Sequence, residues 1–100
     1  MEFGDKLERI GEGAFEKTSI RSIKLQRVRD IGIAAFAECL QLTEVELSKD
    51  LETVGGGAFV RCPLLRRIAL PLKENMLEND VVFRGCDDLS QIHRHSWRDP

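Results

Sequence analysis

The chain has 100 residues, and its 15 basic and 17 acidic side chains leave a net charge of −2. This balance excludes the dense positive charge that nucleic-acid binding requires, and no apolar run approaches the roughly 20 residues of a transmembrane helix. The length fits a single domain. We therefore expect no nucleic acid among its partners and no insertion into a membrane.

Taken in chain order, the sequence repeats one pattern, L-x-x-I-G-x-x-A-F-x-x-C-x-x-L-x-x-I-x-L. Its copies align on Phe15, Phe36 and Phe59, and a more divergent copy aligns on Phe83, so that successive Phe residues are 21, 23 and 24 positions apart. Such periods are typical of leucine-rich solenoids, in which each repeat forms one coil and stacked coils share a core. We therefore predict an α/β repeat solenoid of about four coils over residues 1–92, followed by a polar tail over residues 93–100.

Each copy contains two segments that we expect to be short parallel strands. The first covers residues 7–10, 28–31 and 51–54. The second covers residues 22–25, 43–47, 66–70 and 90–92, where apolar and polar residues alternate. The inward positions of this second set are Ile23, Val45, Ile68 and Ile92. The outward positions are Ser22, Lys24, Glu44, Glu46, Arg67, Ala69, Gln91 and His93.

Between the two strands of a copy, a glycine is followed by the Ala-Phe pair and by a cysteine or threonine. We expect Gly11, Gly32 and Gly55 to occupy a backbone conformation open to glycine. A helical turn is predicted after each of them, with Phe filling the interior. Alanine stays small there so that neighbouring coils can approach closely, at Ala14, Ala35 and Ala58.

The three cysteines fall on one repeat position, so we expect a column of buried, reduced thiols at Cys39, Cys62 and Cys86. A disulfide between two of them would leave one thiol over, and a straight column cannot supply the tetrahedral geometry of zinc. The pair His93-x-His95 has no carboxylate or thiol placed to complete a metal site. No metal or cofactor is predicted.

No constellation of catalytic residues is present. The repeats contain no histidine that could serve a nucleophile as base, and Gly55-Gly56-Gly57 lacks the lysine of a phosphate-binding loop. We therefore predict a protein that is not an enzyme and has no catalytic residue.

Outward positions carry opposite charges on neighbouring coils, which favours cross-strand pairing. The predicted neighbours are Lys24 with Glu46, Glu44 with Arg67, Glu8 with Arg29, Arg29 with Glu52, and Arg9 with Asp30. Two interpretations remain open: a solvated mixed-charge surface without function, or a surface that recognises a partner. The residues of the second interpretation are Lys24, Glu44, Glu46, Arg67, Gln91 and His93.

The strings that begin at Ile10-Gly11, Ile31-Gly32 and Val54-Gly55 resemble the BspA-like leucine-rich repeat family over residues 7–92. The divergent stretch 73–80 departs from the pattern, as terminal repeats do. The resemblance implies a curved, right-handed solenoid whose strand face receives protein partners. We expect a scaffold for protein–protein interaction, with a segment of a cell-surface adhesion or structural repeat array as the alternative.

The start of the chain carries no signal-peptide stretch, and an odd number of reduced thiols favours a cytoplasmic location. A leader missing from this chain would favour the cell surface instead. The sequence does not indicate the oligomeric state or the identity of the partner.

Overall fold

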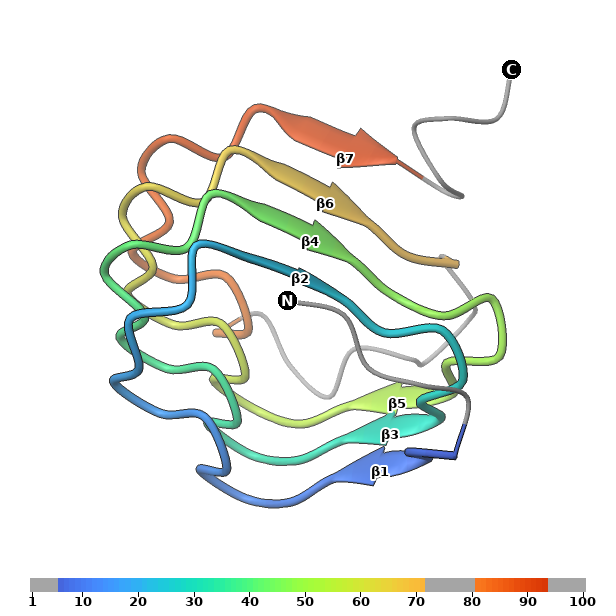
Figure 1. The fold of residues 1–100 in the computed structure, drawn as a ribbon. Helices are drawn as coiled ribbons and strands as arrows, with labels where there is room; N and C mark the ends of the chain where they lie inside the picture. Colours follow the sequence, from blue (N-terminus) through green and yellow to red (C-terminus); the bar gives the residue numbers. More distant parts are fainter. Residues whose placement is uncertain (1–5, 72–80, 94–100) are drawn as a thin grey trace.

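The structure is a computed structural model that describes residues 6–71 and 81–93. The chain winds into stacked coils whose strands form two parallel sheets (Figure 1). The four-stranded sheet contains, in order, β2 (Ser22–Lys24), β4 (Glu44–Glu46), β6 (Arg67–Ala69) and β7 (Gln91–His93). The three-stranded sheet contains β1 (Arg9–Ile10), β3 (Asp30–Ile31) and β5 (Thr53–Val54).

The strand register follows the sequence repeat. Ile23 pairs with Val45, Val45 with Ile68, and Ile68 with Ile92, while Ile10 pairs with Ile31 in the other sheet. The predicted parallel strands and the solenoid are confirmed. Six of the seven strands are shorter than predicted, because the chain turns into the next side of the coil directly after them. The strand β7 has the predicted three residues, shifted by one position.

The predicted helical turns are wrong, since no residue in 6–71 or 81–93 is helical. In the first coil, separate turns are closed by the N–H groups of Ala14, Glu16 and Thr18, each bonded to the carbonyl three residues earlier. Residues with positive φ recur every four positions and prevent these turns from continuing as a helix. They are Gly13 (62°) and Lys17 (61°) in the first coil, and Ala34 (57°) and Glu38 (55°) in the second.

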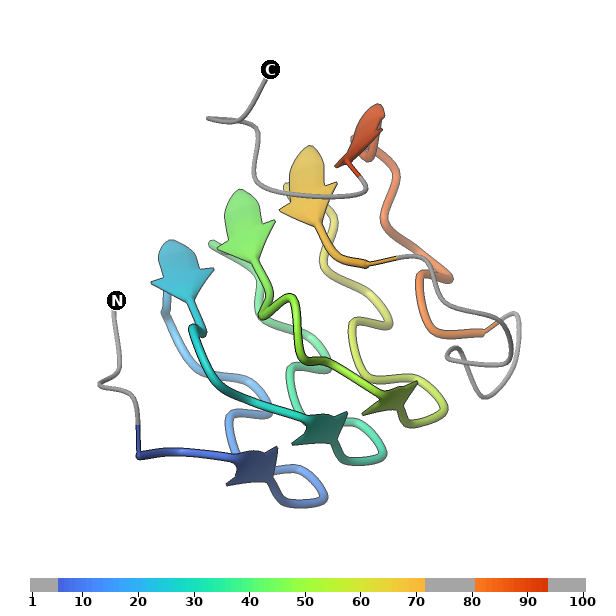
Figure 2. The same cartoon turned by 90° about the vertical axis from the view of Figure 1, so that its right-hand side faces the viewer.

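The turns of neighbouring coils are hydrogen-bonded to one another as strands would be. Gly13 N–H donates to the Ile33 carbonyl at 2.9 Å, and Phe15 N–H donates to the Ala35 carbonyl at 2.8 Å. Lys17 N–H continues this ladder to Ala37 at 2.9 Å. The coils therefore stay in register on all sides, and Figure 2 shows them side by side in chain order.

The glycines that precede the turns have a different role from the one predicted. Gly11, Gly32 and Gly55 have no positive φ. A Cβ on Gly55 would lie 2.5 Å from the backbone nitrogen of Ile33, and a Cβ on Gly32 would lie 2.7 Å from that of Glu12. Glycine is required in the second and third coils because two backbones approach each other closely there, whereas a Cβ on Gly11 would meet nothing within 4 Å.

The phenylalanines form the predicted column through the interior. Ring centroids lie 5.2 Å apart from Phe15 to Phe36 and from Phe36 to Phe59, and 5.9 Å apart from Phe59 to Phe83. The first two pairs are within 3° of parallel. The largest fully buried side chains around this column are Leu25, Ile31, Leu42, Leu51, Leu65, Ile68 and Leu70.

Candidate functional site

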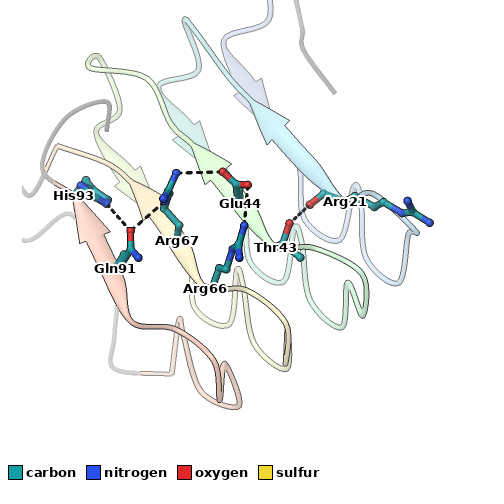
Figure 3. Close-up of polar contacts among 7 residues, drawn as sticks. All are labelled: Arg21, Thr43, Glu44, Arg66, Arg67, Gln91 and His93. Carbon is teal, nitrogen blue, oxygen red and sulfur yellow. Dashed lines mark hydrogen bonds and ion pairs between the residues drawn. The ribbon is translucent and has the colours of Figure 1, made fainter. Parts of the chain in front are cut away.

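The strand face is the outward side of the sheet β2–β4–β6–β7, and a connected network of polar side chains links β4, β6 and β7 on it (Figure 3). Glu44 on β4 forms ion pairs with Arg66 (3.4 Å) and with Arg67 on β6 (3.5 Å). The Arg67 Nε donates a hydrogen bond to Gln91 Oε1 on β7 at 3.1 Å, and His93 Nε2 lies 3.4 Å from the same oxygen. Three adjacent coils are thus joined by side chains that hold one another in place.

Ion pairs on this face orient side chains more than they stabilise the fold. The side chains of Glu44 and Arg67 are 29% and 30% exposed. Pairs exposed to that degree contribute about 0–1 kcal/mol, because water screens them. Each guanidinium and carboxylate is nevertheless held in a defined position at the surface, where an external partner can reach it.

Lys24 and Glu46 form the predicted pair at 3.6 Å, but Glu46 is buried. The prediction that the face exposes Glu46 and Ala69 is wrong, since they are 7% and 1% exposed. Both lie at the last position of their strands, β4 and β6. The accessible members of the predicted surface are therefore Lys24, Glu44, Arg67, Gln91 and His93.

Charges on the opposite sheet also pair between coils. Arg9 and Asp30 are 3.4 Å apart, and Arg29 and Glu52 are 3.5 Å apart, as predicted. Glu8 and Arg29, both in the described part of the chain, form no side-chain ion pair. Their contact is the hydrogen bond from Arg29 N–H to the Glu8 carbonyl at 2.7 Å.

Two ion pairs were missed at the sequence level. Arg27 and Asp50 lie 3.7 Å apart and are separated by 23 residues, the spacing from Phe36 to Phe59, so the repeat itself could have identified them. Arg66 reaches Glu44 diagonally rather than from the aligned position. No repeat position encodes that contact, and only the structure reveals it.

The cysteine column is confirmed as a set of free thiols. Each sulfur donates to the carbonyl of a phenylalanine on the preceding coil: Cys39 to Phe15 (3.2 Å), Cys62 to Phe36 (3.1 Å) and Cys86 to Phe59 (3.0 Å). Hydrogen bonding with the Cys39 and Cys86 thiols, together with burial, raises the pKa of Cys62 above its ordinary range. Its thiol stays protonated, which suits packing and hydrogen bonding rather than nucleophilic chemistry.

Nothing in the described residues forms a metal-binding group of three or more His, Cys, Asp or Glu side chains. His93 belongs to β7 and contacts Gln91, whereas His95 lies outside the described residues. In the same described ranges, no helix has the length and apolar character needed to span a membrane.

The residues 1–96 match the model of the BspA type leucine-rich repeat region in six copies. The chain belongs to the BspA-type leucine-rich repeat family. A search of curated proteins found no significant match. Leucine-rich repeat proteins of this kind are generally interaction or surface repeat proteins.

Solved structures of bacterial leucine-rich repeat proteins are similar to this chain. A protein from Bacteroides capillosus has 34% identity and a TM-score of 0.75, over 86% of this chain and 62% of that one. A T. pallidum leucine-rich repeat protein has 28% identity and a TM-score of 0.77, over 92% and 44%. A leucine-rich cell surface protein from Faecalibacterium prausnitzii, at 21% identity and a TM-score of 0.60 over 93% and 31%, shares the fold. The chain therefore spans less than two-thirds of each of these proteins.

Proposed function

We propose that this chain is a non-enzymatic scaffold that binds a protein partner through its strand face. The observation that supports this most is the network of Glu44, Arg67, Gln91 and His93, in which mutual contacts hold a carboxylate, a guanidinium and neutral polar groups from three coils. Ordering long charged side chains on binding costs about 0.5–1.5 kcal/mol for each side chain. On the strand face the contacts among these side chains already restrict their conformations, so less of this cost remains for binding.

The chemistry of the face favours a polar partner surface with charges of both signs. Arg67 offers planar donors that suit a carboxylate, and Glu44 offers acceptors for a lysine or arginine. Lys24, 32% exposed at its side chain, adds a cation at the first coil of the same sheet. We therefore expect electrostatic complementarity, which mainly sets specificity and association rate, so that binding weakens as salt increases.

The test is a double charge reversal, Glu44→Arg with Arg67→Glu, which keeps opposite charges at these two positions and places the new arginine beside the exposed Arg66. The matched control reverses Arg29 and Glu52, an exposed pair on the other sheet at the same distance of 3.5 Å. A partner is first isolated by affinity capture, and its dissociation constant is then measured for each variant. We expect at least about tenfold weaker binding for the strand-face variant only.

Both double variants should unfold within about 0.5 kcal/mol of the parent chain, because exposed ion pairs contribute little. Equal binding by the parent and the strand-face variant would contradict the proposal. An equal loss from the control variant would also contradict it, since the binding surface would then include the opposite sheet.

A segment of a longer cell-surface or structural array is the second candidate. The similar solved proteins support it, because this chain spans 62% and 44% of the first two. The two candidates differ in location. The reduced thiols favour a cytoplasmic scaffold, whereas a segment of a surface array would lie outside the cell. Protease treatment of intact cells would degrade the chain in the surface case and leave it intact in the cytoplasmic case.

A further inference from the structure

The turn face, formed by residues 11–18, 32–39, 55–62 and 81–86, contains a groove of about 590 Å³ that the strand-face proposal does not use. Its base is made of small residues, including Ala34 and Gly57, which leave the space that larger side chains would fill. Ile33 borders the groove and is 48% exposed, and Val60 adds further apolar surface. An exposed isoleucine beside an open groove is apolar surface without a partner.

The charged side chains of this groove are divided by coil. Glu16 and Glu38 come from the first two coils, whereas Arg61 and Arg84 come from the last two. Lys17 shares a repeat position with Glu38 and Arg61 but does not line the groove. One end of the groove is therefore acidic and the other basic, along the direction in which the coils stack.

These four charges differ from the charges of both sheets. In and beside the sheets, carboxylates and guanidinium groups of neighbouring coils form ion pairs at 3.4–3.7 Å. Within the described part of the chain, none of Glu16, Glu38, Arg61 and Arg84 forms an ion pair, although Glu38 and Arg61 stand on adjacent coils. Their charge is available to a partner.

A two-fold axis that lies in the plane of the turn face, perpendicular to the direction in which the coils stack, brings the acidic end of one copy onto the basic end of another. In a two-fold interface the same patch serves both molecules, so it must be complementary to itself. A face with acidic residues at one end and basic residues at the other is complementary to itself in this arrangement. Its apolar centre then contacts the apolar centre of the second copy. The ridge that carries Ile33 in one copy can enter the groove of the other.

We propose that the turn face is a homodimer interface in which two copies pack antiparallel, with Glu16 and Glu38 of one copy against Arg61 and Arg84 of the other. A specific interface buries at least about 1,000 Å² in total, which the two turn faces would have to supply together. The charged contacts of such a dimer weaken with salt.

The test uses two charge variants and their mixture. Variant A carries Glu16→Arg and Glu38→Arg, so its groove is basic throughout; variant B carries Arg61→Glu and Arg84→Glu, so its groove is acidic throughout. Sedimentation velocity over a concentration series measures dimerisation of the parent chain, of each variant, and of an equimolar mixture. Circular dichroism checks that the variants are folded; three of the four substituted positions are exposed and Glu38 is half-buried.

We expect a concentration-dependent parent dimer, dimerisation at least about tenfold weaker for either variant alone, and a dimer again when A and B are mixed. In a dimer of A with B every facing pair is opposite in charge, whereas in a dimer of A with A or of B with B every facing pair has like charges. Ile33→Ser in the parent chain should weaken the dimer without affecting the strand face.

A parent chain that remains monomeric up to about 1 mM would overturn the proposal. A groove that binds an extended peptide while the chain stays monomeric would be one such result. Dimers of A or B that match the parent dimer would overturn it as well, as would a mixture that fails to associate. The strand-face variant is the control: it should dimerise like the parent chain, so that failure of this inference and failure of the proposed function are separate results.

Discussion

The two inner coils and the two outer coils share the phenylalanine and strand positions of the repeat, yet equivalent residues differ in burial. Phe36 and Phe59 are 0% exposed, whereas Phe15 and Phe83 on the outer coils are only partly buried. Ile92 has the register position of Ile68, yet it is 52% exposed while Ile68 is fully buried. Ile92 has the predicted inward register position, but within the described residues no further coil covers it.

The difference shows that a repeat residue is buried by its neighbours and not by its own coil. In a stack, stability is approximately the sum of what each repeat contributes and of the interfaces between adjacent repeats. An inner coil has two such interfaces, and an outer coil has one in the described part of the chain. The same substitution should therefore have unequal effects at equivalent positions.

The largest effect is expected for the phenylalanine column. Phe59→Ala should lower the free energy of unfolding by about 3–5 kcal/mol through the cavity that it leaves. Phe15→Ala should cost about half as much, because its ring is already partly exposed. Urea denaturation followed by circular dichroism measures both, and equal losses would contradict the distinction between inner and outer coils.

Glycine substitutions are expected to have the next largest effect on the free energy of unfolding. Gly55→Ala should destabilise the chain by about 2–3 kcal/mol, because its Cβ would lie 2.5 Å from the Ile33 backbone nitrogen and force two coils apart. Gly11→Ala should be neutral or stabilise by up to about 1 kcal/mol, since nothing lies within 4 Å and alanine restricts the unfolded chain. Thermal melts of the two variants compare them, and a destabilised Gly11→Ala would refute the argument.

The buried thiol of Cys62 should make stability depend on alkaline pH. Its pKa is raised in the folded state, so above the unfolded-state pKa of about 8.5 only the unfolded chain loses the proton. Stability is then fully present below that pH and falls by about 1.4 kcal/mol per pH unit above it. The urea midpoint of the parent chain should therefore fall between about pH 8.5 and about pH 10, and a constant midpoint over that range would contradict this account.

The smallest effect concerns Ala34, which has a φ of 57° at the position that Gly13 and Gly57 occupy in the neighbouring coils. Ala34→Gly should stabilise the chain by about 1 kcal/mol, because it removes the strain of a left-handed alanine. The matched control Ala14→Gly, at an exposed position without positive φ, should destabilise it by about 0.5–1 kcal/mol. Melting temperatures that shift in the same direction for both would show that Ala34 is not strained.

Features that depend on alignment between coils were predictable from the sequence. The phenylalanine column, the cysteine column and the Lys24–Glu46 pair follow from the repeat period alone, because the coils stack in register. The helical turns were not predictable in this way, since a short segment rich in alanine also suits a helix. Ladder hydrogen bonds between neighbouring turns, such as Phe15 N–H to Ala35, replace the bonds that a helix would make within the segment.

The sequence predicted which residues lie on the strand face, but not how exposed each of them is. Alternation along a strand assigns Glu46 and Ala69 to the outward side, but it does not indicate what covers them. The groove on the turn face also escaped sequence analysis, because its space arises from the small residues of two coils placed together. Such features depend on contacts between segments, which a single repeat does not encode.

Native-state hydrogen exchange tests the central claim, that neighbours on both sides determine the stability of a coil. The informative amides are those of Phe36, bonded to Ala58, and of Gly55, bonded to Ile31, in the inner coils, and those of Gly13 and Gln91 in the outer coils. The account predicts that the inner amides exchange only through global unfolding, and that the outer ones exchange at least about tenfold faster through local opening. Uniform protection from Gly13 to Gln91 would contradict it.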